Sequence, residues 1–96
     1  MPKRTKTGQA KHDKAVLRSA DWYKKRGYSV KADVPGWDKP KTIGGRRPDL
    51  IVKKGKKEIV KEIETKDSNK KDLKQHKAFS QYAARKKTRD FQKKII

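Results

Sequence analysis

Residues 47–66, RPDLIVKKGKKEIVKEIETK, decide the fold of this chain. Two runs rich in β-branched residues, 49–52 and 58–66, flank a lysine-rich turn around Gly55, and this pattern is typical of a β-hairpin. In an antiparallel hairpin the start of the first strand lies beside the end of the second, so we expect Asp49 and Glu64 to be neighbours in space. Because side chains alternate along a strand, Glu64 and Lys66 should share a face. The sequence therefore predicts two carboxylates and one ammonium group at one end of the hairpin.

The residues before the hairpin predict a helix, a strand and a loop. Residues 9–26 have helical periodicity, and Gly27 ends the helix as a left-handed residue commonly does. Residues 28–34 have the pattern of a strand, and residues 37–47, with one proline, two glycines and four basic side chains, predict an exposed loop. The inner face of the helix is expected to carry Asp13, Val16, Leu17, Ala20 and Tyr23.

The residues after the hairpin predict a second helix and a final strand. Ser68 or Asn69 can cap a helix that runs to about residue 87, and residues 91–96 can form a short strand. The resulting order α-β-β-β-α-β predicts an α/β fold with a mixed sheet flanked by helices. The inner face of the second helix is expected to carry Leu73, His76, Phe79, Tyr82 and Ala83.

The length and charge of the chain limit its organisation and its partners. Its 96 residues suffice for one domain, so we expect a flexible basic arm at residues 1–8 and a single domain at residues 9–96. The 30 basic residues exceed the 11 acidic ones and give a net charge of +19, which favours nucleic acid as the partner. The alternative explanation of the charge is the lysine-rich, solvated surface of a protein adapted to high temperature. That adaptation usually raises the content of Glu as well as Lys.

Several classes of protein are excluded by composition. The absence of cysteine excludes disulfides and cysteine-ligated metals. The basic N-terminus lacks the apolar stretch of a secretory signal, and no segment has the length and apolar character of a membrane span. We therefore expect an intracellular protein (cytoplasmic, nucleoid-associated or viral) with no membrane contact and no small-molecule cofactor.

The residues at the end of the hairpin suit phosphodiester hydrolysis. Carboxylate oxygens from Asp49 and Glu64 are the ligands that Mg²⁺ prefers, and Mn²⁺ is an alternative. The metal acidifies a bound water and stabilises the charge that builds on the phosphate, while Lys66 can orient or deprotonate that water. The competing interpretation of Glu64 and Lys66 is a solvated charge pair of little energetic value.

Two fragments of the chain resemble the signature motifs of the PD-(D/E)-x-K nuclease superfamily. They are GRRPDLIV at residues 45–52 and ETK at residues 64–66. Small size and an early helix make the chain most similar to small archaeal Holliday junction resolvases. The resemblance implies a restriction-endonuclease-like fold over nearly the whole chain, with Asp49, Glu64 and the Thr65 carbonyl as metal ligands and Lys66 as a catalytic residue.

The resemblance also suggests accessory positions. An acidic residue on the first helix often reaches the metal through water; Asp13 fits the inner stripe and Asp21 does not. In the resolvases the corresponding glutamate lies nearer the helix-ending glycine than Asp13 does. The alternative is therefore that Asp13 is only an acidic residue near the helix N-terminus that interacts favourably with the helix dipole. Gln75 matches a glutamine on the second helix, with an ordinary polar residue as its alternative. Glu62 shares a strand face with Glu64, but we interpret it as a solvated edge residue rather than a second ligand.

The loop is expected to contact nucleic acid. Arg46 and Arg47 flank Asp49 and can reach phosphates, and Lys41 adds charge. Trp37 can stack on a base or cover one end of the core, and the second interpretation is slightly favoured. His12 and His76 are not spaced as a metal pair and are interpreted as polar surface or helix-face residues.

These observations predict a Mg²⁺- or Mn²⁺-dependent DNA endonuclease. By resemblance the preferred substrate is branched DNA, and the thin core of a small domain favours a homodimer. Two alternatives remain open: a non-catalytic basic nucleic-acid-binding protein, and an RNA-directed nuclease of the same fold.

Overall fold

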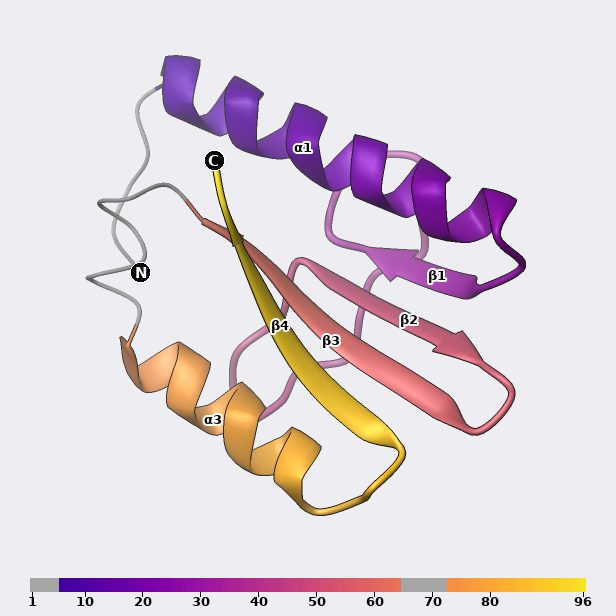
Figure 1. The fold of residues 1–96 in the computed structure, drawn as a ribbon. Helices are drawn as coiled ribbons and strands as arrows, with labels where there is room; N and C mark the ends of the chain where they lie inside the picture. The colour runs from indigo at the N-terminus through magenta and orange to yellow at the C-terminus, as the bar shows by residue number, and fades with distance from the viewer. Residues whose placement is uncertain (1–5, 65–72) are drawn as a thin grey trace.

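A computed structural model describes residues 6–64 and 73–96 of the chain. Within these ranges the element order is helix, three strands, helix and strand, as the sequence predicted (Figure 1). Residues 1–5 of the predicted arm at 1–8 and the segment 65–72 lie outside the described residues, and residues 6–8 belong to the first helix. The elements are α1 (Lys6–Lys25), β1 (Ser29–Ala32), β2 (Leu50–Lys54), β3 (Lys57–Glu64), α3 (Leu73–Ala84) and β4 (Arg89–Ile95).

The four strands form one mixed sheet in the order β1-β2-β3-β4. β1 pairs with β2 and β2 with β3 in antiparallel register, and Gly55 supplies the positive φ of 59° that the tight β2–β3 turn requires. β4 pairs with β3 in parallel, because the chain crosses back past α3 before it enters the sheet. The predicted α/β class with a mixed sheet is thus confirmed.

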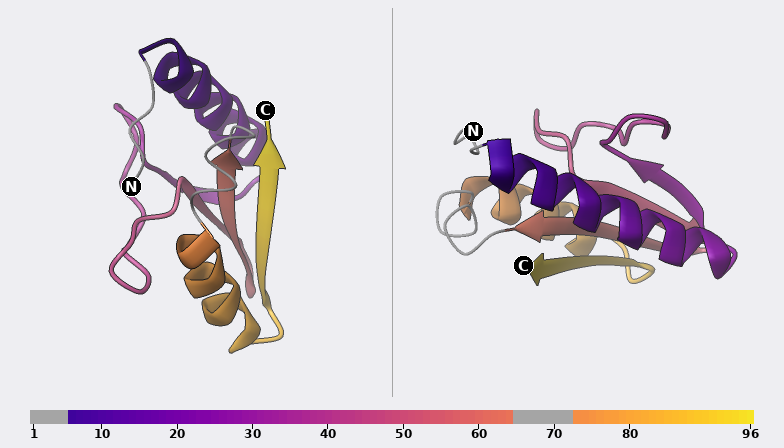
Figure 2. Two further views of the ribbon diagram at one scale, coloured as in Figure 1. Left: turned by 90° about the vertical axis from the view of Figure 1, so that its left-hand side faces the viewer. Right: turned by 90° about the horizontal axis from the view of Figure 1, so that it is seen from above.

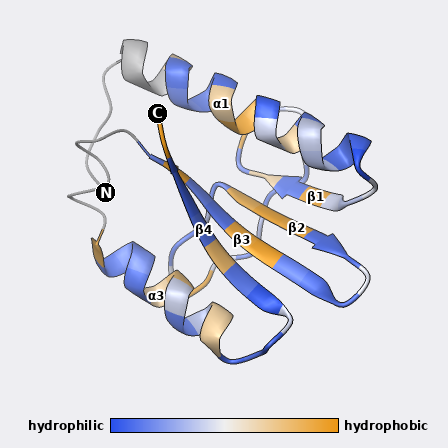
Figure 3. Ribbon diagram, viewed as in Figure 1, coloured by the Kyte–Doolittle hydropathy of each residue, from blue (hydrophilic) through white to orange (hydrophobic). Residues whose placement is uncertain are grey.

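The two helices cover opposite faces of the sheet (Figure 2). Leu50 and Val52 of β2 pack with Val16 of α1 in one apolar cluster, whereas Ile51 packs with Phe79 of α3 in the other. This alternation follows from the two-residue period of a strand. The centres of β2 and β3 are accordingly the most apolar part of the ribbon, and the outer faces of the helices are hydrophilic (Figure 3).

The boundaries of several elements differ from the prediction. α1 begins at Lys6, three residues early, and β4 begins at Arg89 rather than at residue 91. Two apolar residues assigned to inner helix faces are exposed, Leu17 by 37% and Leu73 by 63%. Leu73 is the first described residue of α3. Among the described residues, no helix is both long and apolar enough for a membrane crossing.

At the start of β3 a buried carboxyl group anchors α3 to the sheet. The Tyr82 hydroxyl donates a 2.6 Å hydrogen bond to Glu58 Oε2, and Arg89 Nε lies 3.7 Å from the same oxygen. Burial opposes ionisation of Glu58. The hydrogen bond from Tyr82 and the charges of Lys53, Lys41 and Arg89 outweigh that effect, so the pKa of Glu58 is lowered.

Removing the Tyr82 hydroxyl should destabilise the fold. We expect Tyr82→Phe to lower the free energy of unfolding by about 1–3 kcal/mol, because a buried acceptor loses its donor. Urea denaturation measures this change. Tyr28→Phe, at a half-buried tyrosine on the α1 face, is the matched control and should change stability by about 0.5 kcal/mol or less. Equal effects of the two variants would show that the contact with Glu58 contributes nothing.

Candidate active site

The β2–β3 hairpin places Asp49 against Glu62. Leu50 pairs with Lys61, so Asp49, one residue earlier, lies beside Glu62 rather than opposite Glu64. The backbone N–H of Asp49 donates to Glu62 Oε1 at 3.2 Å, and Asp49 Oδ2 accepts a 2.9 Å hydrogen bond from the Ile63 N–H. These bonds fix the aspartate at the point where β2 begins.

Glu62 is a central member of the site, and its assignment as a solvated edge residue was wrong. It is only 1% exposed, and Glu64 is fully buried. Burial is the largest cause that raises the pKa of Glu62, and the neighbouring Asp49 and Glu64 carboxyl groups raise it further, to about 11. Glu62 therefore holds a proton at neutral pH in the absence of a cation. Three carboxyl groups share one end of the sheet.

Two consecutive residues in the first turn of α3 complete this side of the site. The Gln75 amide nitrogen donates to Glu62 Oε2 at 3.2 Å, and His76 Nε2 lies 3.3 Å from Glu64 Oε1. The structure thus places Gln75 beside the predicted acidic residues. His76 is 6% exposed, as its predicted place in the inner stripe of the helix indicated, and it is not the surface residue that was the other interpretation.

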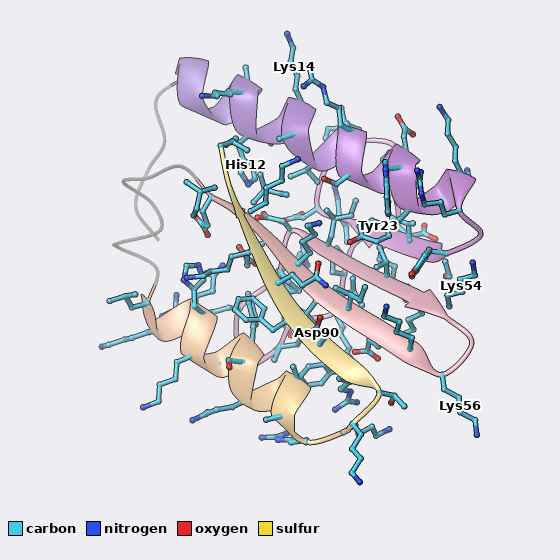
Figure 4. The ribbon with its side chains drawn as sticks, viewed as in Figure 1. His12, Lys14, Tyr23, Lys54, Lys56 and Asp90 are labelled. Carbon is cyan, nitrogen blue, oxygen red and sulfur yellow. The ribbon has the colours of Figure 1, made fainter. Side chains whose placement is uncertain are left out.

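The first helix contributes His12 rather than Asp13. His12, which is labelled on α1 in Figure 4, is 3% exposed. Its Nε2 lies 3.2 Å from Asp49 Oδ2. The side chain of Asp13 is 37% exposed and lies 3.3 Å from His12 Nδ1. The spacing explains the correction, because His12, Val16 and Ala20 follow each other at four-residue steps and form the buried line of the helix. Asp21 is exposed, as predicted.

Thr65 and Lys66 lie outside the described residues. The predicted metal-binding role of the Thr65 carbonyl and the predicted catalytic role of Lys66 therefore stay predictions from the sequence. Their neighbour Glu64 is the last residue of β3, and its backbone oxygen accepts a 2.8 Å hydrogen bond from the Ile96 N–H.

The loop before Asp49 carries arginines next to the site. Gly44, Gly45, Arg46 and Arg47 line a cavity of about 370 Å³ together with Asp33, and Arg47 Nη1 lies 3.7 Å from Asp33 Oδ1. A Cβ atom on Gly44, which has a φ of 61°, would lie 3.2 Å from the Ala78 side chain, so this glycine lets the loop approach α3 closely.

The other two residues predicted to bind nucleic acid have different surroundings. Trp37 packs against the apolar cluster under α1, with Lys24 Nζ 5.4 Å from the centre of its ring. This is the core-covering position that the sequence slightly favoured, and it leaves less of the ring for a base. Lys41 Nζ lies 4.8 Å from the Tyr82 ring, near Glu58 at the opposite end of β3 from Glu64.

The donor atoms at the site fit a divalent cation. Glu62, Glu64 and His76 each offer one ligand atom, and these atoms lie within 4.8 Å of one another. Gln75 Oε1 and His76 Nδ1 are buried and have no hydrogen-bond partner among the described residues. Buried polar atoms normally have partners, so these two are available to a ligand. The carboxylate oxygens suit Mg²⁺ and Mn²⁺, whereas an imidazole nitrogen is a ligand more typical of transition metals.

Comparison with known proteins agrees with this fold. The family model AHJR-like, described as REase_AHJR-like, matches residues 4–87, which include every element from α1 to α3. The name denotes restriction-endonuclease-like proteins similar to archaeal Holliday junction resolvases, and the family indicates a nuclease. No curated protein and no solved structure matches the chain significantly. The chain belongs to the AHJR-like family of restriction-endonuclease-like proteins.

Proposed function

We propose that the protein is a metal-dependent endonuclease that hydrolyses the phosphodiester backbone of DNA with Mg²⁺ or Mn²⁺. The convergence of Asp49, Glu62 and Glu64 at one end of the hairpin carries this proposal. Buried carboxyl groups that crowd together repel one another when ionised. A bound cation removes that repulsion, which gives a physical reason for a chain with so few acidic residues to gather three of them in one place.

The side chains at the site have separable roles in this proposal. Glu62, Glu64 and His76 would hold the cation, and the Gln75 carbonyl oxygen would approach it from α3. When bound, the cation supplies Lewis acidity towards the phosphate and towards the attacking water. His12 orients the Asp49 carboxylate, which the Ile63 N–H also holds.

Lys66 and the arginines would act on the substrate. Lys66 follows Glu64 by two residues, so strand alternation would put it on the same face, where its ammonium group could orient the water. Arg46 and Arg47 precede Pro48-Asp49 and would bind the phosphates next to the cleaved bond. With a net charge of +19, the rest of the surface would attract the DNA backbone. We propose branched DNA as the substrate and a homodimer as the acting species.

An assay across nucleic acid architectures tests the proposal. Labelled DNA duplexes, flaps and four-way junctions, and an RNA duplex of the same sequence, are incubated with the protein in Mg²⁺ or in EDTA. We expect cleavage of DNA only in Mg²⁺, preferentially at branches, and loss of cleavage but not of binding in Asp49→Ala and Lys66→Ala. Light scattering on the same preparation should give the mass of a dimer.

Several outcomes would contradict this function. Cleavage in EDTA, or cleavage by Lys66→Ala at the wild-type rate, would overturn the mechanism. Binding to every substrate without cleavage under any metal condition would show a non-catalytic binding protein, and cleavage of RNA alone would show an RNA-directed nuclease.

A further inference from the structure

A basic groove runs between α1 and β4, on the sheet face opposite α3. It consists of two adjoining cavities of about 210 and 250 Å³ that share Arg18. We call it the α1–β4 groove. The first cavity is lined by Arg18, Ser19, Trp22, Tyr23, Lys61 and Lys94, and the second by Lys11, Lys14, Ala15, Arg18 and Ile96.

The charge of the groove suits a phosphate backbone. Lys11, Lys14 and Arg18 follow one another at three- and four-residue steps, so they lie in a row on one face of α1. Lys61 and Lys94 add two cations from the sheet side. Among the described residues that line the two cavities, none is acidic. Lys14 extends from the helix into solvent (Figure 4), where it can reach a phosphate without a change in the fold.

Trp22 lies at one end of the groove and is 49% exposed. The Arg26 guanidinium covers its ring at 3.6 Å, and the Tyr23 ring meets it edge-on at 4.9 Å. These contacts hold the indole in one orientation while leaving half of its surface in contact with solvent. Trp22 does not belong to the hydrophobic core, because the buried residues of this part of α1 are Ala20 and Tyr23. A fixed, exposed indole beside cations is the arrangement on which unpaired bases stack.

The other end of the groove adjoins the candidate active site. Ile96 lines this end, and its N–H donates to the backbone oxygen of Glu64. His12, which contacts Asp49, precedes Trp22 by ten residues on α1, a separation of about 15 Å along the helix axis. A strand that leaves the active site therefore meets the row of cations before it reaches the indole.

We propose that the α1–β4 groove binds an unpaired DNA strand, with its phosphates on Lys11, Lys14, Arg18 and Lys94 and a base stacked on Trp22. This inference rests on the proposed nuclease function and narrows its substrate. The enzyme acts on DNA in which a duplex adjoins a single-stranded arm. The groove guides the arm and so holds the junction at the end of β3 that carries the carboxylates. A second copy of the chain is the competing occupant of the exposed indole, and the test separates the two.

Binding measured without divalent cation tests the groove independently of cleavage. The full chain is titrated in EDTA against a fluorescent blunt duplex and against the same duplex with an oligo(dT) arm, with anisotropy as the readout. The wild type should bind the armed duplex more tightly. Trp22→Ala should weaken binding of the armed duplex by about 5- to 100-fold and leave the blunt duplex unchanged. Trp22→Phe, which keeps an aromatic ring, should retain most of the preference.

Two lysine variants provide matched controls for charge. Lys94→Gln should reduce the slope of log affinity against log salt concentration by about one for the armed duplex. The affinity for the blunt duplex should not change. Lys56→Gln removes the same charge at the β2–β3 turn, which points away from the groove (Figure 4). This substitution should change the affinity for the blunt duplex and for the armed duplex by the same factor. In a Trp37→Phe background Trp22 is the only tryptophan, and oligo(dT) should quench its fluorescence.

The proposal fails if Trp22→Ala weakens blunt and armed duplexes equally, or if oligo(dT) leaves the Trp22 fluorescence unchanged. It also fails if Trp22→Ala converts a dimer into a monomer in light scattering, because the indole would then belong to a subunit interface. Each of these results leaves metal-dependent cleavage of DNA untouched, since none of the measurements requires catalysis.

Discussion

Glu64→Gln is expected to lower the rate of DNA cleavage by about 100- to 1000-fold, the usual cost of losing one group that stabilises transition-state charge. The substitution keeps the size and the hydrogen bonding of the fully buried side chain but removes a charge from the cation site. The rate is measured in single turnover with Mg²⁺ and saturating branched DNA. DNA affinity in EDTA should not fall, because the variant gains one positive charge overall.

Glu58→Gln is the matched control for this prediction. Glu58 lies on the same strand and faces the same helix as Glu64, but it contacts Tyr82 at the other end of β3. Its substitution makes the same chemical change and should leave the cleavage rate close to that of the wild type at temperatures well below unfolding. A similar loss of rate in both variants would mean that Glu64 affects cleavage only through the stability of the fold. Full activity of Glu64→Gln would show that Glu64 has no role in cleavage.

The metal-free protein is expected to become less stable as the pH rises above about 4.5. In the folded chain the pKa of Glu62 is raised from 4.5 to about 11, so Glu62 keeps a proton that the unfolded chain releases. The stabilisation that accompanies this proton is fully present below pH 4.5 and is lost progressively as the pH approaches 11. Glu62 contributes at most about 1.4 kcal/mol per pH unit to the slope of the free energy of unfolding against pH. Urea denaturation in EDTA between pH 5 and pH 8 measures it.

Glu62→Gln isolates this contribution from other titrating groups. The variant carries no titratable proton at position 62, so its stability should fall less steeply with pH, and at pH 8 in EDTA it should be more stable than the wild type. Mn²⁺ should raise the melting temperature of the wild type more at pH 8 than at pH 5, because ligands bind cations in their deprotonated form. Parallel stability curves for variant and wild type would show that Glu62 is not held protonated.

The sequence predicted the order of the elements and the hairpin because both depend on local patterns. The alternation of 49–52 and 58–66 around Gly55 and the four-residue period of α1 each appear within a short window. The parallel pairing of β3 with β4 joins segments far apart in the sequence, and no local pattern predicted it. The predicted pairing of Asp49 with Glu64 is displaced by one strand alternation, because the carboxyl group hydrogen-bonded to Asp49 belongs to Glu62.

The burial of the glutamates could not be predicted from β3 alone. All three glutamates of the chain, Glu58, Glu62 and Glu64, lie on one face of this strand, and charged residues at alternate positions normally indicate a solvated face. The face is buried because α3 packs over it, and each glutamate then acquires a partner from that helix: Tyr82, Gln75 and His76 respectively. This tertiary contact joins segments more than ten residues apart.

Residue type led to a wrong choice on α1. An acid was expected on the inner face of this helix, and this choice passed over His12, whose four-residue spacing to Val16 marked it as buried. Trp37 packs against the core, as was slightly favoured, whereas Trp22 is the more exposed indole. On α1, helical phase was a better guide than the preferred chemistry of a position.

We propose that one divalent cation binds among the carboxyl groups at the end of the hairpin. An anomalous difference map from crystals soaked in Mn²⁺ would locate this cation. We expect a single strong peak within ligand distance of Glu62, Glu64 and His76. Peaks confined to exposed aspartates such as Asp90, or the same peak in crystals of a Glu62→Gln, Glu64→Gln double variant, would contradict it.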